Sequence, residues 1–451
     1  MEVFIKVSQF LLSLSILIVL HELGHFIPAK LFKTKVEKFF LFFDYKFALF
    51  KKKIGETVYG IGWIPLGGYV KIAGMIDESM DTEQLKEEPK PWEFRSKPAW
   101  QRLIIMLGGV TVNFLLGIFI YIIMLAVWGE KYIPNDNLKD GIWVYDDLGK
   151  DLGLETGDKI LSVDGHKIEK FSSIPIEFIN GNSFTIERNG QIIKKEIPVD
   201  FISKLVDRGK DAGNFISIRI PFVVGKIPDT SKNYNSGLKP KDLLVAINEQ
   251  PVKYFDQAQE ILDHNKNKEL TLTVKRGGEL KDIPVTTGKD GKIGVSLAQL
   301  NTDDLEKLGY YKFETINYNI GQAIPAGFHK AFETLSNYVK QLKKVINPST
   351  GAYKGLGGFM SIGSIFPAEW DWQSFLGITA FLSIMLAFMN LLPIPALDGG
   401  HVVFTLYEMI TGRKPSDKFL EYAQIAGFVV LLALLLFANG NDIYRWITGK
   451  F

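Results

Sequence analysis

The sequence predicts a polytopic α-helical membrane protein with four transmembrane helices, a membrane-associated β-region and two inserted domains of mixed α/β structure. Three observations lead to this fold class. Long apolar runs lie toward both ends of the chain, whereas residues 146–170 carry a charge at about every third position. A segment of alternating apolar residues follows the first apolar run, and a pattern in the polar middle occurs twice.

Composition excludes several classes of protein. The 451 residues are 47% hydrophobic and 23% charged, with a net charge of +2 and a mean hydropathy of +0.09. These averages conceal an uneven distribution, which rules out a uniform soluble globule. The balanced charge argues against a nucleic-acid partner, which requires a clustered basic excess. Because the chain has no cysteine, it has no disulfide, thiolate metal site or cysteine nucleophile.

Four apolar stretches are each long enough to cross the hydrocarbon core, which takes about 20 residues of helix. They lie at about 4–27, 103–128, 375–397 and 420–438. The first has only Lys6 before its apolar core and H-E-L-G-H where a signal-peptide cleavage site would follow. We therefore expect a retained helix there.

Basic loops predict the orientation of these helices. Residues 28–55 contain eight lysines, and the connector after the third helix carries Arg413, Lys414 and Lys418. The positive-inside rule places both segments in the cytoplasm. The long segment 129–373 then lies outside, although a domain of this size translocates regardless of its own charge.

The polar middle contains a tandem repeat. GLETGDKILSVDGHKI at 153–168 recurs as GLKPKDLLVAINEQPV at 237–252, and each copy ends in an alternating, strand-like pattern. A hairpin around an Arg-X-Gly turn follows each copy, at 184–199 and at 270–285. Two small mixed domains are therefore expected rather than a solenoid.

The two copies resemble PDZ domains, whose G-L-x-x-G-D-x-I-x-x-[VI]-[DN]-G signature the first copy keeps. The second copy has Lys241 and Glu249 where the family has glycine. Residues 223–227 are the predicted carboxylate-binding loop, which captures a peptide C-terminus by strand addition; a spacer or steric gate that binds nothing is the alternative. The predicted domains are the N-terminal membrane half at 1–128, the two PDZ domains at 129–222 and 223–300, an extracytoplasmic amphipathic helix and loop at 301–373, and the C-terminal membrane half at 374–451.

The strongest chemical signal is His21-Glu22-Leu23-Gly24-His25 in the first apolar run. Positions i and i+4 share one face of a helix, so the two imidazoles can ligate one Zn²⁺ while Glu22 deprotonates a bound water. Ionisable side chains inside a membrane segment are costly and point to function. Two satisfied histidines beside a snorkelling glutamate are the alternative.

A catalytic zinc site needs a third protein ligand. Asp398, at the end of the third apolar segment, is a better candidate than His166, His264, His329 or His401. If the helices alternate in direction, the first and third run parallel, and tilt can bring the two motifs to one depth. Prolines before Asp398 unwind the helix, which a membrane tolerates where backbone is buried or lines a wet cavity. A plain helix-terminating turn is the alternative.

With these motifs the chain resembles the site-2 protease family of intramembrane zinc metalloproteases, and within it the bacterial regulator-of-sigma-E group. Three motifs match in order: H-E-x-x-H in the first helix, G-x-x-x-N at 109–113 and N-x-x-P-x-P-x-L-D-G-G at 390–400. The resemblance covers essentially the whole chain. It implies that His21, His25 and Asp398 bind Zn²⁺, that Glu22 is the general base, and that Asn390 holds the substrate or the developing oxyanion.

Further expectations rest on the same resemblance. Asn113 is expected to be a supporting residue near the site that contributes to substrate binding. An interhelical hydrogen bond made by Asn113 is the alternative. The implied substrates are single-pass membrane proteins of the anti-sigma factor type, already trimmed outside by another protease, and signal-peptide remnants. The implied location is the bacterial inner membrane, with the active site near the cytoplasmic face and the PDZ domains in the periplasm.

Residues 36–75 look like the family's membrane-associated β-region. Apolar side chains alternate from Phe39 to Leu49, and Gly67-Gly68-Tyr69 follows a turn. We expect Gly67, Gly68 and Tyr69 to bind substrate at an edge strand, because a protease must hold a transmembrane segment extended before cutting it. An ordinary cytoplasmic sheet is the alternative.

A further amphipathic helix is expected after the repeats. Apolar residues recur at helical spacing from Phe328 to Val345, with lysines among them. This helix either lies on the outer membrane surface or packs against a PDZ domain.

Three rival functions remain at this point. The chain can be a membrane zinc protease for soluble or lipidated peptides, with its site open to the cytoplasm. It can also be a non-catalytic PDZ scaffold or chaperone with a structural zinc, which has no need of a base at Glu22. Ion transport is weaker, because no second set of intramembrane charges is found to form a pathway.

Overall fold

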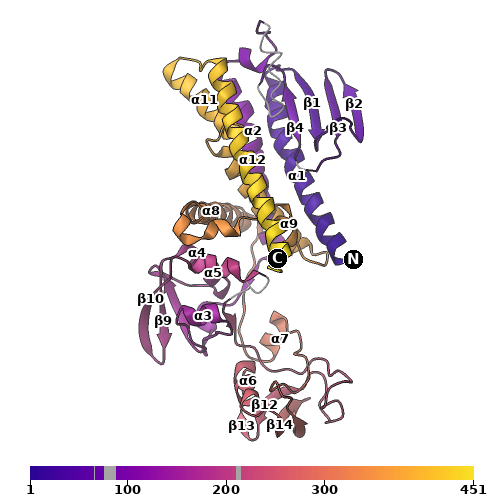
Figure 1. Cartoon of the computed structure of the whole chain (residues 1–451), viewed down its shortest axis with the longest axis vertical. Helices are drawn as coiled ribbons and strands as arrows, with labels where there is room; N and C mark the ends of the chain where they lie inside the picture. Colours follow the sequence, from indigo (N-terminus) through magenta and orange to yellow (C-terminus); the bar gives the residue numbers. More distant parts are fainter. Residues whose placement is uncertain (66, 76–87, 210–214, 451) are drawn as a thin grey trace. The chain divides into compact units, whose positions relative to one another are not determined.

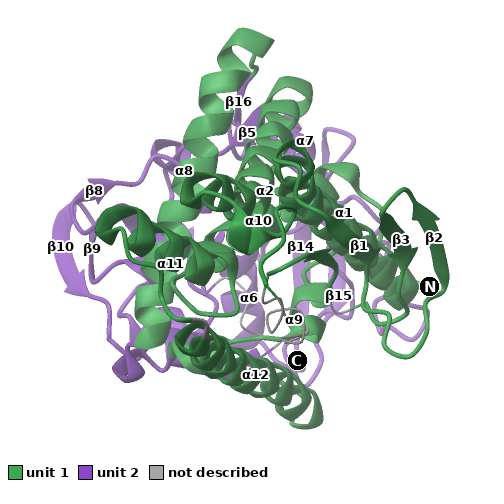
Figure 2. Cartoon of the chain, turned by 90° about the horizontal axis from the view of Figure 1, so that it is seen from above, with its two compact units in different colours: residues 1–129, 317–346, 352–451 green, residues 130–316, 347–351 purple. Residues whose placement is uncertain are grey.

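The computed structural model describes residues 1–65, 67–75, 88–209 and 215–450. Position 66 of the predicted β-region, positions 76–87 of the N-terminal half, positions 210–214 of the first predicted PDZ domain and position 451 therefore lie outside the described residues. The chain forms two compact units, coloured in Figure 2. Unit 1 comprises 1–129, 317–346 and 352–451, and unit 2 comprises 130–316 and 347–351.

Within the described residues, four helices, all of them in unit 1, are long and apolar enough to cross a membrane, which confirms the number predicted from the sequence. They are α1 (Glu2–Leu31), α2 (Ala99–Trp128), α10 (Trp372–Leu391) and α12 (Asp417–Ile447). α2 packs extensively against both α1 and α10. Small residues allow the closest approach, as is common between membrane helices.

The third membrane helix ends earlier than the sequence predicts. α10 stops at Leu391 rather than at Leu397, because Pro393 and Pro395 lack the N–H groups that would continue it. A short loop follows, and a new helix, α11 (Asp398–Thr411), begins at Asp398. The sequence interpretation placed Asp398 at the end of a helix, whereas it is the first residue of the next one.

The β-region forms a four-stranded sheet beside α1 (Figure 1). The strand order is β2-β3-β1-β4, with β1 parallel to β3 and antiparallel to β4. The alternating pattern gives a strand only as far as Leu41, since the backbone turns at Phe42 with a φ of 67°. In the strand order given above, β4 is the last strand and lies at one edge of the sheet. The strands are β1 (Val36–Leu41), β2 (Phe50–Ile54), β3 (Thr57–Ile61) and β4 (Tyr69–Ile72).

Unit 1 also contains the amphipathic helix α8 (Ile320–Ile346) and the short helix α9 (Phe359–Ser364). α8 packs against α2 and α10 through its small residues Ala323, Gly327 and Ala331, which are its buried positions. A Cβ on Gly327 would lie 2.5 Å from a side-chain carbon of Ile122, so this crossing requires glycine. Several of the larger apolar side chains of the predicted stripe remain partly exposed.

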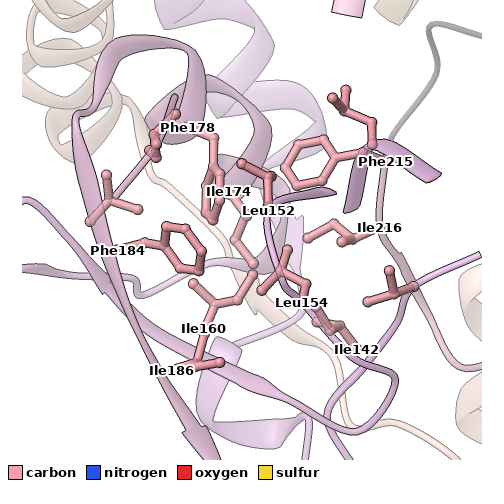
Figure 3. Close-up of a cluster of buried hydrophobic side chains, with 14 of the residues drawn as sticks. Ile142, Leu152, Leu154, Ile160, Ile174, Phe178, Phe184, Ile186, Phe215 and Ile216 are labelled. Carbon is pink, nitrogen blue, oxygen red and sulfur yellow. The ribbon is translucent and has the colours of Figure 1, made fainter. Parts of the chain in front are cut away.

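Unit 2 contains two four-stranded sheets whose strands follow the same order, β8-β7-β9-β10 in the first copy and β13-β12-β14-β15 in the second. The repeat read from the sequence is thus a structural repeat. Both predicted hairpins form, and their two-residue turns, Asn189-Gly190 and Gly277-Gly278, have positive φ throughout. Figure 3 shows the core of the first copy, in which Phe178 and Phe184 pack together and Phe215 also contacts Phe178.

The α-helices and strands of unit 2 are β5 (Glu130–Tyr132), β6 (Ile142–Trp143), α3 (Asp147–Asp151), β7 (Lys159–Val163), β8 (His166–Lys167), α4 (Ile174–Asn180), β9 (Ser183–Arg188), β10 (Gln191–Glu196), α5 (Phe201–Asp207), β11 (Ser217–Ile218), β12 (Leu243–Ile247), β13 (Gln250–Pro251), α6 (Phe255–Asp263), β14 (Glu269–Arg276), β15 (Glu279–Thr286), α7 (Thr302–Lys307) and β16 (Glu314–Ile316).

Each copy is held by one buried aspartate and one arginine. Both carboxylate oxygens of Asp158 accept from Arg188 at 2.7 Å, and those of Asp242 accept from Arg276 at 2.6 Å. Burial alone would raise the pKa of Asp242, but hydrogen bonds from Arg276 and the Lys239 backbone outweigh it and lower the pKa. These aspartates are the ones that the repeated signature contains.

The predicted carboxylate-binding loop at residues 223–227 is wrong. Its backbone is hydrogen-bonded on both edges: Val224 N donates to Asp242 O on one side, and Gly225 N donates to Ser296 O on the other. The adjoining bridge joins Val223 to Leu243. A peptide has no free edge to pair with there, because the chain itself occupies both.

Candidate metal centre

Three metal-ligating side chains converge in unit 1. His21 Nε2 and His25 Nε2 each lie 3.3 Å from Asp398 Oδ2, and they lie 3.2 Å from each other. Both histidines are buried, with exposed fractions of 9% and 5%. Among the described residues, this is the group of three His, Cys, Asp or Glu side chains whose spacing suits a metal ion. His166, His264, His329 and His401 do not belong to it.

The spacing of the three atoms fits zinc. Ligands placed tetrahedrally at about 2.0–2.1 Å from a zinc ion are about 3.3–3.4 Å from one another. The three measured separations match that edge length closely. Two imidazoles and one carboxylate also form a usual catalytic zinc set, which leaves a fourth position open.

Glycines of α1 and α2 create the space for this cluster. A Cβ on Gly24 would lie 2.4 Å from Gly108 O, and a Cβ on Gly108 would lie 1.9 Å from Gly24 O. The two backbones therefore touch at Gly24, which lies between the two histidines in sequence and directly before His25. A Cβ on Gly109 would lie 2.3 Å from His25 Nε2 and 2.7 Å from His21 Cε1. Gly109 thus keeps clear the volume into which both imidazoles point.

Polar groups on α2 orient both rings. His25 Nδ1 lies 2.8 Å from Ile105 O, and a carbonyl only accepts, so Nδ1 carries the proton and Nε2 keeps its lone pair. Asn113 is fully buried, and its Nδ2 lies 3.2 Å from His21 Nδ1. An amide flip that exchanges Nδ2 and Oδ1 would let Asn113 accept from Nδ1–H and leave His21 Nε2 free for metal.

Glu22 lies between the histidines in sequence and faces the edge strand β4. The backbone N–H of Val70 donates to its carboxylate. A Cβ on Gly68 would lie 2.4 Å from Ile18 Cγ2 and 3.7 Å from Glu22 Cγ. Glycine at position 68 therefore lets the strand approach α1 beside this carboxylate.

Of the remaining predicted site residues, Asn390 contacts the cluster, whereas Tyr69 and Gly67 make contacts within the β-region. Asn390, in the last turn of α10, places its Nδ2 3.4 Å from His21 Nε2. Tyr69 directs its hydroxyl to Asp44, at 2.7 Å, so its side chain braces the sheet and its backbone belongs to the edge. Gly67 lies beside the Phe43 ring, which a Cβ would approach to 3.0 Å.

Three contributions to the site were not identified from the sequence. The carbonyl of Ile105 and the N–H of Val70 are backbone groups, which leave no signal in residue identity. Gly109 was recognised only as part of G-x-x-x-N, although its missing side chain makes room for the cluster.

The sequence is similar to a known protease family and to several proteins of known or assigned activity. The family model described as "Peptidase family M50" matches residues 9–434. The regulator of sigma-E protease RseP of Escherichia coli is 27% identical over 97% of this chain and 98% of its own length. The regulator of sigma E protease of Haemophilus influenzae is 25% identical over 98% of this chain and 99% of its own length.

A third relative, from Campylobacter jejuni, is provisionally named a zinc metalloprotease; it is 28% identical over 97% of this chain and 92% of its own length. The family and the name of this relative agree with zinc as the metal. Because the family model spans nearly all of the sequence, the protein belongs to peptidase family M50, the site-2 protease family of zinc metalloproteases.

Proposed function

We propose that this protein hydrolyses peptide bonds within the membrane-spanning segments of single-pass proteins, as a step of regulated intramembrane proteolysis. One observation carries the proposal: His21, His25 and Asp398 converge where α1 meets the loop after α10, and both helices are long enough to span a membrane. Substrates of the anti-sigma factor type are supported by the name of the Escherichia coli relative. Signal-peptide remnants are a second substrate class.

The proposed roles follow from the positions of the side chains. His21, His25 and Asp398 would hold a zinc ion, which would supply a water of lowered pKa and polarise the scissile carbonyl. Glu22 takes the proton of the attacking water and passes it to the leaving amine. Asn390, with its amide beside His21, donates to the developing oxyanion.

We assign Asn113 and Ile105 to the orientation of the two imidazoles. Each lies on the Nδ1 side of its histidine, away from the Nε2 atoms that face Asp398. An orienting partner fixes the tautomer and the ring angle of a metal-binding histidine.

The edge strand β4 supports binding of the substrate in extended form. A transmembrane helix hides its carbonyls in internal hydrogen bonds, so the scissile segment must be unwound before hydrolysis. β4 lies at the edge of its sheet, and Val70 within it contacts Glu22. We propose that the substrate adds a strand along Gly67, Gly68 and Tyr69, which places its scissile carbonyl near the cluster.

The proposed orientation follows the basic loops. The lysine-rich sheet and the Arg413–Lys418 connector lie in the cytoplasm, with the active site near that face of the inner membrane. The repeat domains lie outside. We propose that they are of the PDZ type and exclude substrates whose external domain is still bulky, so that another protease acts first.

The test uses the full-length protein in lipid vesicles with one single-pass substrate, prepared with and without its external domain. We expect cleavage within the transmembrane segment of the trimmed form only. A zinc chelator should abolish this cleavage, and added Zn²⁺ should restore it.

Equal cleavage of both substrate forms would contradict the size filter. Cleavage of soluble or lipidated peptides, with transmembrane segments left intact, would instead favour a protease open to the cytoplasm.

A further inference from the structure

α12 is a mostly exposed helix with a few buried positions. Within the part of α12 that the structure describes, the buried residues are Gln424, Gly427 and Asp442. Gln424 is only 5% exposed. A buried amide on an otherwise exposed membrane helix needs a partner, because an unsatisfied polar group there is costly.

The partner of Gln424 lies in the loop that carries Asp398. Gln424 Oε1 accepts a hydrogen bond from Ala396 N at 3.1 Å. Ala396 has a φ of 80°, in the left-handed region that an alanine rarely adopts. The surroundings must hold such a conformation in place, and this hydrogen bond is made at the strained residue itself.

Backbone packing confines the same loop on two sides. A Cβ on Gly427 would lie 1.6 Å from Pro395 O, so α12 touches the loop directly. A Cβ on Gly400, in the first turn of α11, would lie 2.7 Å from Ile394 O. The loop therefore contacts both α11 and α12.

We propose that Gln424 and Gly427 are positioning residues, which hold the loop at Ile394–Leu397 so that Asp398 completes the metal site. This inference rests on the proposed zinc site. Asp398 follows Ala396 by two residues and is the first residue of α11, so a shift at Ala396 is transmitted to the carboxylate. Neither residue touches the metal ligands; both act through the loop.

The inference predicts weaker zinc binding from changes outside the ligand set. Outer partners of metal ligands typically contribute 10–100-fold in affinity. We expect Gln424→Leu and Gly427→Ala to raise the zinc Kd by about 10-fold or more. Leucine is preferred to alanine at position 424, because Gln424 also lines a cavity of about 70 Å³ that truncation would enlarge.

Two variants serve as matched controls. Gln424→Glu keeps an oxygen that can accept from Ala396 N, so its Kd should stay within about twofold of the wild type. Gly440→Ala makes the same change as Gly427→Ala on the same helix, at a position where a Cβ meets nothing within 4 Å. It should leave the Kd unchanged.

The measurement is the zinc Kd of each full-length protein in detergent, by competition with a chelator, together with the Tm of the zinc-free form. A lowered Tm with an unchanged Kd in Gln424→Leu would overturn the inference, since that result reports a purely structural role. Gln424→Leu is also the variant to use where Gly427→Ala fails to fold. Absence of zinc binding by the wild type would overturn the metal site itself, and the two failures are thus distinguishable.

Discussion

The Glu22→Gln protein is expected to retain zinc and to lose cleavage, with kcat reduced by about 10²–10⁴-fold. Glutamine keeps the size of the side chain and can still accept from Val70 N–H, but it cannot take a proton from water. His21, His25 and Asp398 are unchanged by the substitution, so the metal should remain.

Zinc content and cleavage of a trimmed single-pass substrate are measured on the same preparation. Glu2→Gln is the matched control, because it makes the same change at an exposed position of the same helix. A Glu22→Gln enzyme that keeps more than a tenth of wild-type kcat would exclude Glu22 as the general base.

The second large effect is expected from Gly109→Ala, which adds a single methyl group. That methyl would lie 2.3 Å from His25 Nε2 and 2.7 Å from His21 Cε1, in the space that the ligand atoms share. Since the α2 backbone cannot retreat without losing its contact with Gly24, the imidazoles must move. We expect zinc affinity and cleavage both to fall by about 100-fold or more, the upper range for disturbed metal surroundings.

Gly117→Ala is the control for this substitution. It lies on the same helix, and its new methyl would meet mainly the flexible end of Ile384, at 2.5 Å. Zinc content by elemental analysis separates the two variants. Stoichiometric zinc in Gly109→Ala would show that the metal lies elsewhere.

The grouping of the candidate metal ligands was predictable because it depends on residue types at fixed spacing. His21 and His25 are one helical turn apart wherever the first apolar run is helical. Because the chain has no cysteine, Asp398, which follows a segment broken by prolines, was the best candidate for the third ligand. The orienting and confining contacts were not predictable. Ile105, Val70 and Gln424 are far in sequence from the residues they contact, and nothing in the motifs specifies the packing of α2, β4 or α12.

The same distinction between local patterns and distant contacts applies to the fold. Continuous apolar runs and a repeated signature predicted four membrane helices and two similar sheets, because both patterns are local. The end of α10 at Leu391 depends on two prolines and on the start of a new helix, α11. This helix was not predicted from the sequence. The double pairing of residues 223–227 depends on the segment around Ser296, which is not a regular strand and lies about 70 residues further along the chain.

The most direct test of the central claim is zinc K-edge X-ray absorption on the wild type and on Asp398→Ala. The proposed site predicts two imidazole nitrogens and carboxylate or water oxygens at about 2.0–2.2 Å. In Asp398→Ala, the carboxylate contribution should disappear and the affinity should fall, with both imidazoles retained. A wild-type spectrum without imidazole scattering, or an Asp398→Ala spectrum identical to that of the wild type, would contradict the assignment of His21, His25 and Asp398 as the zinc ligands.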